Sequence, residues 1–209
     1  MSYEPGDEAW DDFYSSLSEE LYPEHKAQAI SEFTRDRLRS FYLMNPDLMV
    51  PALAMYMESK VLWSMKRPTP TVVFYMTTLE LLLKATLLKP IVYGLVHNEG
   101  LAGLIVEHAL GQTGLHRYKG LLAKIYQDLT GLDISKVSRT GSSMPLLDES
   151  LELQKIRNKI IHQGDQALIE EANRSKEIVS EAFDSIVHPI LLSLGLKLIP
   201  GGSGKISGA

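Results

Sequence analysis

Three side chains near the end of one predicted helix, Arg157, Asn158 and His162, have types and a spacing suited to acid–base chemistry on an anion. An imidazole titrates near neutral pH, so it can accept and return a proton. A guanidinium is always charged and can bind two anionic oxygens at once, which stabilises negative charge that develops during a reaction. Asn158 precedes His162 by one helical turn, about 40° away in projection, so its amide can orient the ring or bind the same anion.

The helix that must position these groups runs through Leu151 and stops at Gly164. With Arg157 set at 0°, a compact apolar stripe falls between roughly 260° and 340° and is predicted to face the core; it contains Leu146, Leu153, Ile156 and Ile160. The arc that carries Arg157, Asn158 and His162 also carries apolar residues, namely Leu147, Leu151 and Ile161. Two interpretations of this mixed arc stay open: a polar seam against a neighbouring helix, with His162 favoured at the helix C-terminus, or a surface that binds a partner.

The run Arg157-Asn158-Lys-Ile-Ile-His162, followed by a turn, resembles the Arg-Asn-x-x-x-His signature of HEPN domains, which are small α-helical modules of prokaryotic toxin, abortive-infection and RNA-processing systems. A second match is Glu80-Leu-Leu-Leu-Lys84, which is similar to a Glu-x-x-x-Lys element that some HEPN families place on an earlier core helix. The resemblance covers about residues 70 to 196. It implies an antiparallel helical bundle.

The resemblance also implies a metal-independent endoribonuclease in which the ribose 2′-hydroxyl attacks the adjacent phosphate, with Arg157, Asn158 and His162 as catalytic residues. Glu80 and Lys84 would then lie near His162; an ordinary surface salt bridge is the alternative for this pair. Arg157 and His162 are about 140° apart on a regular helix, so we expect two copies of the chain to assemble one site. The predicted homodimer buries Leu147, Leu151 and Ile161.

Such a protein would act on RNA without a cofactor, as a toxin or antiviral defence effector with a possible antitoxin or regulatory protein as partner. One position departs from the pattern: many toxins paired with a nucleotidyltransferase antitoxin carry a modifiable tyrosine two residues after the histidine, where this chain has Gly164. That form of control is therefore not expected. The competing hypotheses are a non-catalytic HEPN-like bundle that binds a partner protein or a nucleotide, and an unrelated helical regulator.

Composition is that of a globular protein, with 44% hydrophobic and 22% charged residues. The absence of cysteine excludes disulfides, thiolate metal sites and a cysteine nucleophile. His97, His108 and His116 have no compact metal-ligand spacing, so no metal site is predicted. The net charge of −5 reflects eight acidic residues before Lys26, and the remaining 21 basic and 18 acidic residues leave a slightly basic body. Net charge therefore does not argue against RNA.

Helical periodicity along the chain predicts an all-α protein with three parts. Residues 1–69 are expected to form an N-terminal helical extension that ends at the proline pair Pro68 and Pro70, and residues 70–196 the bundle. Residues 197–209 are expected to be a disordered tail. Residues 131–145 are expected to form a mobile loop, and Pro189 should bend the last helix. With no secretory signal and with charges that interrupt every apolar run, we expect a cytoplasmic protein that is not inserted in a membrane.

Overall fold

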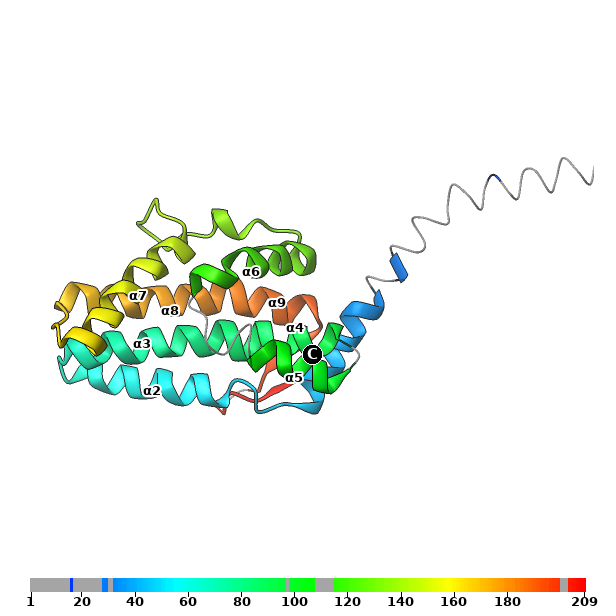
Figure 1. Ribbon diagram of the computed structural model, residues 1–209, viewed down its shortest axis with the longest axis horizontal. Coiled ribbons are helices and arrows are strands. Elements are labelled where there is room, and N and C mark those ends of the chain that lie inside the picture. Colours follow the sequence, from blue (N-terminus) through cyan, green and yellow to red (C-terminus); the bar gives the residue numbers. More distant parts are fainter. Residues whose placement is uncertain (1–15, 17–27, 30–31, 97, 108–114, 200–202) are drawn as a thin grey trace, which may run out of the picture.

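The computed structural model describes residues 16, 28–29, 32–96, 98–107, 115–199 and 203–209. Apart from residue 16, the acidic segment before Lys26 lies outside the described residues, as do His97 and His108. The described part is mainly α-helical (Figure 1), which confirms the predicted all-α class.

Residues 32–44 form a helix that leads into the bundle. The long helices that follow are α2 (Val50–Ser64), α3 (Pro68–Leu83), α6 (Leu115–Thr130), α7 (Leu146–Gln163) and α8 (Ile169–Ala182). Shorter helical segments are α4 (Lys89–Leu95), α5 (Glu99–Ile105), the 3₁₀ turn η3 (Ile134–Lys136) and α9 (His188–Ser193). Two short strands, β1 (Leu196–Leu198) and β2 (Ile206–Gly208), pair antiparallel near the C-terminus.

Helix α3 lies at the centre of the bundle and contacts α2, α7 and α8 (Figure 1). Its sequence is apolar on nearly every side, a pattern that places a helix inside a protein. The apolar stretch from Pro68 to Gly94 is long enough to span a membrane, yet most of it is buried inside the bundle. This burial is typical of a helix in the core of a bundle.

The helices that contain Pro90 and Pro189 are built alike at the proline. A π-helical turn precedes each proline: η1 (Lys84–Leu88) precedes Pro90, and η4 (Phe183–Val187) precedes Pro189. Proline has no N–H for the carbonyl four residues earlier. A tyrosine hydroxyl from another helix donates to that carbonyl instead: Tyr42 Oη to Thr86 O at 2.5 Å and Tyr126 Oη to Ser185 O at 2.8 Å. Burial raises the pKa of both tyrosines, so the hydroxyls remain donors.

Residues on both sides of the predicted boundary at residue 69 share one core. Leu38, Tyr42, Met49 and Ala52 belong to the same buried cluster as the apolar residues of α3 and α8. The proline pair does start a new helix, since α3 begins at Pro68. The turn before Pro68 reverses the direction of the chain, so that α2 packs along α3.

The predicted disorder of the tail is wrong for residues 203–209. Ile206 is 2% exposed, and its N–H donates to the carbonyl of Pro46. Gly204 has a φ of 69°, and a Cβ there would lie 3.2 Å from the side chain of Leu53. Glycine thus supplies both the left-handed backbone and the close approach to α2 that the paired strands need.

Candidate functional site

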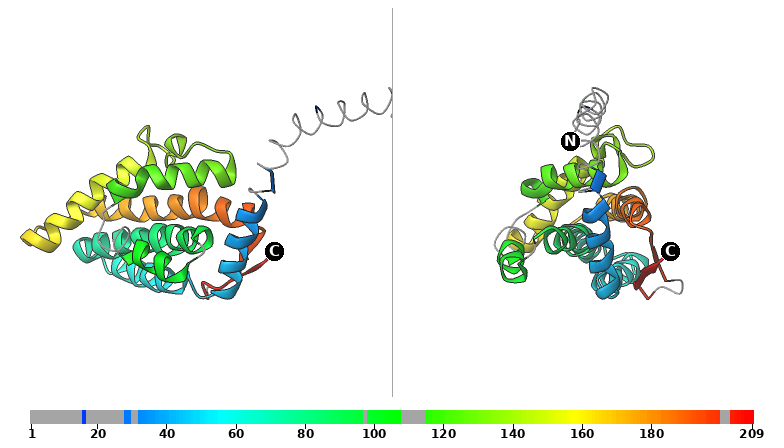
Figure 2. Two further views of the ribbon diagram at one scale, coloured as in Figure 1. Left: turned by 45° about the vertical axis from the view of Figure 1, so that its right-hand side comes forward. Right: turned by 90° about the vertical axis from the view of Figure 1, so that its right-hand side faces the viewer.

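The C-terminal half of α7 carries the predicted catalytic residues at one end of the bundle. Figure 2 shows this half extending past the ends of the neighbouring helices. The helix stops at Gly164, which adopts a left-handed φ of 74° and donates its N–H to the carbonyl of Ile160. A left-handed residue is a common helix terminator, and glycine adopts it without a Cβ penalty.

The three polar side chains are accessible on this helix end. Asn158 and His162 are exposed and Arg157 is half-buried. The Arg157 guanidinium donates from Nη1 to Asn158 Oδ1 at 3.2 Å, so these two groups act as a pair. Among the described residues, no hydrogen bond or ion pair holds the His162 imidazole. A cation in the last turn is favoured by the helix dipole.

The core stripe predicted for α7 is confirmed. Leu146 and Leu153 are fully buried, and Ile156 and Ile160 pack against the core cluster with part of their surface exposed. Near the helix end the apolar surface reaches solvent: Ile161 is 46% exposed. The turn into α8 adds two more exposed apolar side chains, Leu168 and Ile169.

The predicted dimer residues do not share one environment. Leu147 is 1% exposed within a single chain, so it has no surface to give to a second copy. That residue is corrected to a core position. Leu151 is half-buried against the core, which leaves Ile161 as the most accessible of the three. A helical projection gives the direction of a side chain but not which segment covers it, and here residues 131–145 bring Ile134 into the core.

Glu80 and Lys84 form the expected pair, with Lys84 Nζ 2.7 Å from Glu80 Oε1. The ammonium also lies over the Tyr118 ring at 5.5 Å, and the lysine side chain is only 15% exposed. Burial, and then the charge of Glu80, raise the pKa of Tyr118. The pair therefore belongs to a partly buried contact between α3 and α6.

Within one chain this pair lies away from His162. The Ala167 N–H, five residues after His162, donates to Thr69 Oγ1 in the first turn of α3 at 3.0 Å. Glu80 is eleven residues further along α3, or about 16 Å on a regular helix. The structure thus brings Arg157, Asn158 and His162 to one helix end and leaves Glu80 and Lys84 beside Tyr118.

Sequence reasoning missed a buried carboxylate on the same helix. The Glu149 side chain is 3% exposed and accepts from Arg139 Nε at 2.9 Å and from Arg174 Nε at 2.7 Å. Arg139 also pairs with Glu177, and Arg174 with Glu152. The network ties the segment expected to be a mobile loop to α7 and α8, so Arg139 is held by acidic residues. Burial opposes ionisation of Glu149, but the hydrogen bonds from both guanidiniums outweigh it and lower its pKa.

The sequence did contain a signal for this network. Glu149 falls at roughly 280° in the projection of α7, inside the apolar stripe. A carboxylate at such a position needs a charged partner, because an unpaired buried charge is very costly.

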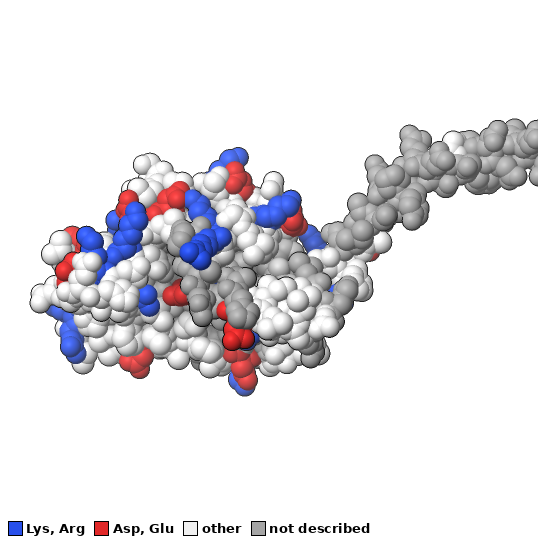
Figure 3. Space-filling view, in the orientation of Figure 1, with Lys and Arg blue, Asp and Glu red and all other residues white. Residues whose placement is uncertain are grey.

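The surface around α6 and α7 is mixed in charge. In the view of Figure 3, Lys and Arg side chains gather over these two helices with acidic side chains between them. Lys155 and Lys159 of α7 and Arg117 of α6 are exposed. Lys119 pairs with Asp148 at 2.5 Å and so neutralises part of this surface.

In comparisons with known proteins, no family model, no curated protein and no solved structure matches this chain.

Proposed function

We propose that this protein is a HEPN-like, metal-independent endoribonuclease that works as a homodimer in the cytoplasm, as a toxin or antiviral defence effector. The observation that carries the proposal is the accessible group of Arg157, Asn158 and His162 on the last turns of α7. A histidine whose ring is unoccupied by other side chains can exchange protons with a substrate, and a guanidinium beside an amide is suited to a phosphate.

In the proposed reaction, the ribose 2′-oxygen forms a bond to the adjacent phosphorus as the bond from phosphorus to the 5′-oxygen breaks. One His162 accepts the proton of the 2′-hydroxyl, and the imidazolium of a second copy gives a proton to the leaving 5′-oxygen. Arg157 stabilises the extra negative charge on the phosphate oxygens. Asn158, already hydrogen-bonded to Arg157, orients that guanidinium.

The dimer follows from helix geometry. Arg157 and His162 are separated by about 140° around the axis and about 7.5 Å along it, so one copy does not aim both groups at one phosphate. Two copies of the α7 end, related by a two-fold axis, would place Arg157 of one near His162 of the other. The exposed Ile161, with Leu168 and Ile169 beyond the turn, supplies apolar surface for that contact.

The direct test is incubation of total RNA with the purified protein in EDTA. We expect cleavage by the wild type and a loss of about 10²-fold or more for His162→Ala and for Arg157→Ala. Lys124→Ala is the matched control, because it removes one exposed positive charge from α6 and not from the helix that carries the proposed site. Sedimentation at micromolar concentration should give a dimer that Ile161→Asp weakens.

Intact RNA with the wild-type protein would overturn the assignment and favour the non-catalytic bundle that binds a protein or a nucleotide. Cleavage by a species that sediments as a monomer would overturn the two-copy geometry alone.

A further inference from the structure

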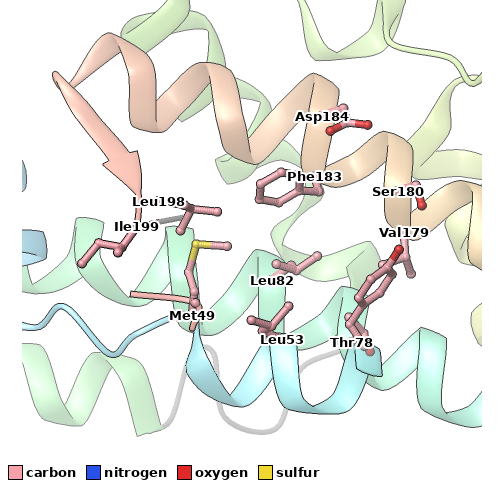
Figure 4. A pocket seen from close by; sticks show the side chains of 12 residues that line it. Met49, Leu53, Thr78, Leu82, Val179, Ser180, Phe183, Asp184, Leu198 and Ile199 are labelled. Atoms are coloured by element: carbon pink, nitrogen blue, oxygen red, sulfur yellow. The ribbon is translucent and has the colours of Figure 1, made fainter. Parts of the chain in front are cut away.

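A cavity of about 410 Å³ opens between α2, α3, the α8–η4 helix and the C-terminal hairpin (Figure 4). Protein interiors are close-packed, and a void of this size lies in the range of small-molecule sites. Its wall is mostly apolar and is formed by Met49, Leu53, Leu82, Val179, Phe183 and Leu198.

The cavity is a product of the fold rather than of one segment. The left-handed Gly204 holds the hairpin against Leu53 on one side. On the other side the wall includes Phe183, the first residue of the π-helical turn. Such a turn displaces the side chains that follow it, and π-helical turns are frequent at functional sites.

The polar side chains that line the cavity are Tyr56 of α2, Thr78 of α3, Ser180 and Asp184. Ser180 and Asp184 are one turn apart on the α8–η4 helix, which forms the upper edge in Figure 4. Asp184 is the one charged residue among those that line the cavity. Within the described part of the chain, its carboxylate has no hydrogen bond or ion pair with another side chain.

Several basic residues lie near the cavity without lining it, among them Lys197 and His188, whose ring stacks on Phe183. Lys60 Nζ lies over the Tyr56 ring at 5.8 Å, and Lys205 Nζ is 3.2 Å from Asp47. Among the residues that line the cavity, the charge comes from the Asp184 carboxylate and is negative. An apolar interior with one carboxylate at the edge is complementary to a molecule that has an apolar body and a cationic head.

We propose that this cavity binds a small amphiphilic amine, whose apolar body fills the space between Met49, Leu82 and Phe183 and whose ammonium group pairs with Asp184 beside Ser180. The site is separate from the proposed ribonuclease site on α7, and the proposal does not depend on RNA cleavage.

Three probes with one alkyl chain and different heads test the proposal: decylamine, decanol and decanoate, titrated calorimetrically into the full chain at pH 7 below their micellar concentrations. An alkylamine is protonated at this pH. We expect saturable binding in the order amine, alcohol, carboxylate. Asp184→Asn should weaken the amine roughly five- to tenfold and leave the alcohol unchanged.

Asp165→Asn is the matched control, since it removes one exposed carboxylate in the turn between α7 and α8 and should change nothing. The proposal is overturned if none of the probes saturates, if decanoate binds as tightly as decylamine, or if Asp184→Asn and Asp165→Asn bind the amine equally well. Both variants change exposed residues, and a melting temperature equal to that of the wild type shows that each is folded.

Discussion

Glu149 shows how a single charged residue is accommodated in this core. Its carboxylate is almost fully buried, which alone would strongly disfavour the charged form. Two guanidiniums from separate segments, Arg139 and Arg174, compensate by donating hydrogen bonds to it. Each arginine is also paired with a second, exposed carboxylate, so two guanidiniums are shared among three carboxylates. The contribution of Glu149 is thus to fix residues 131–145 against α7 and α8.

Glu149→Gln should lower the free energy of unfolding at pH 7 by roughly 2–3 kcal/mol, because charge-assisted hydrogen bonds to both arginines are weakened. The folded-state pKa of Glu149 is below the usual 4.5, so its stabilisation is complete above about pH 4.5 and is lost as pH falls through the lowered value. Urea unfolding between pH 7 and pH 3 measures both effects. The variant should lose less stability on acidification than the wild type.

Glu170→Gln is the control for this experiment, because Glu170 is exposed in the first turn of α8. If the free energy of unfolding of Glu149→Gln fell with pH as much as that of the wild type does, the network would not be stabilising the ionised carboxylate.

Among single residues, the sequence predicted the direction of the side chains on α7 better than their environment. Periodicity placed Leu146 and Leu153 in the core correctly, since the period of the helix is fixed by its geometry. It could not predict that Leu147 would be covered, because the cover comes from elsewhere in the chain. That Arg157, Asn158 and His162 act on RNA stays a prediction.

For secondary structure elements, the ends of helices were easier to predict than the irregular turns within them. Gly164 was predicted to stop α7, and it does so with a left-handed backbone. The helix that was expected to bend at Pro189 contains a π-helical turn immediately before the residue that precedes the proline. Its partner Tyr126 lies on α6, and no local pattern around Pro189 identifies a hydroxyl so distant in the sequence.

Gly164→Ala and Gly120→Ala form a matched pair of substitutions. No atom lies within 4 Å of a Cβ at either position, so only the backbone distinguishes them. Alanine at 164 must adopt a φ of 74° and should cost about 1 kcal/mol. Alanine at 120, inside α6, should instead stabilise by up to about 1 kcal/mol.

In thermal and urea unfolding, the stability of Gly164→Ala should therefore fall below that of the wild type, and the stability of Gly120→Ala should rise above it. Equal shifts would mean that α7 does not end at a left-handed residue. A destabilised Gly164→Ala would also show that the end of α7, where the three polar residues lie, depends on this stop.

For the whole molecule, the all-α class and most helices follow from periodicity, but the division into three parts does not. The sequence could not predict how α2 packs on the core, because this helix has apolar residues on several sides. Met57 and Val61 are exposed, whereas Ala52 is buried. The short β1 and β2 gave no alternation long enough to recognise. Their position depends on contacts with α2, which only the folded chain provides.

Ile206→Ala tests whether the C-terminal hairpin is part of the folded unit. Ile206 is 2% exposed and belongs to the main core cluster, so the variant should lose about 2–5 kcal/mol of unfolding free energy. Lys205→Ala, on the exposed neighbour, should change stability by less than about 1 kcal/mol, since it removes one surface ion pair. Circular dichroism during urea unfolding measures both. A disordered tail would leave the two variants indistinguishable from the wild type.

The tyrosine contacts at the two prolines imply an order of assembly. In the helices that contain Pro90 and Pro189, a carbonyl before the proline accepts a hydrogen bond from a hydroxyl of another part of the chain. The hydroxyls are those of Tyr42 and Tyr126. These hydrogen bonds satisfy the carbonyls of Thr86 and Ser185, which the prolines leave without an N–H partner. The helical segments that follow Pro90 and Pro189 should therefore form late in folding, together with the segments that carry Tyr42 and Tyr126.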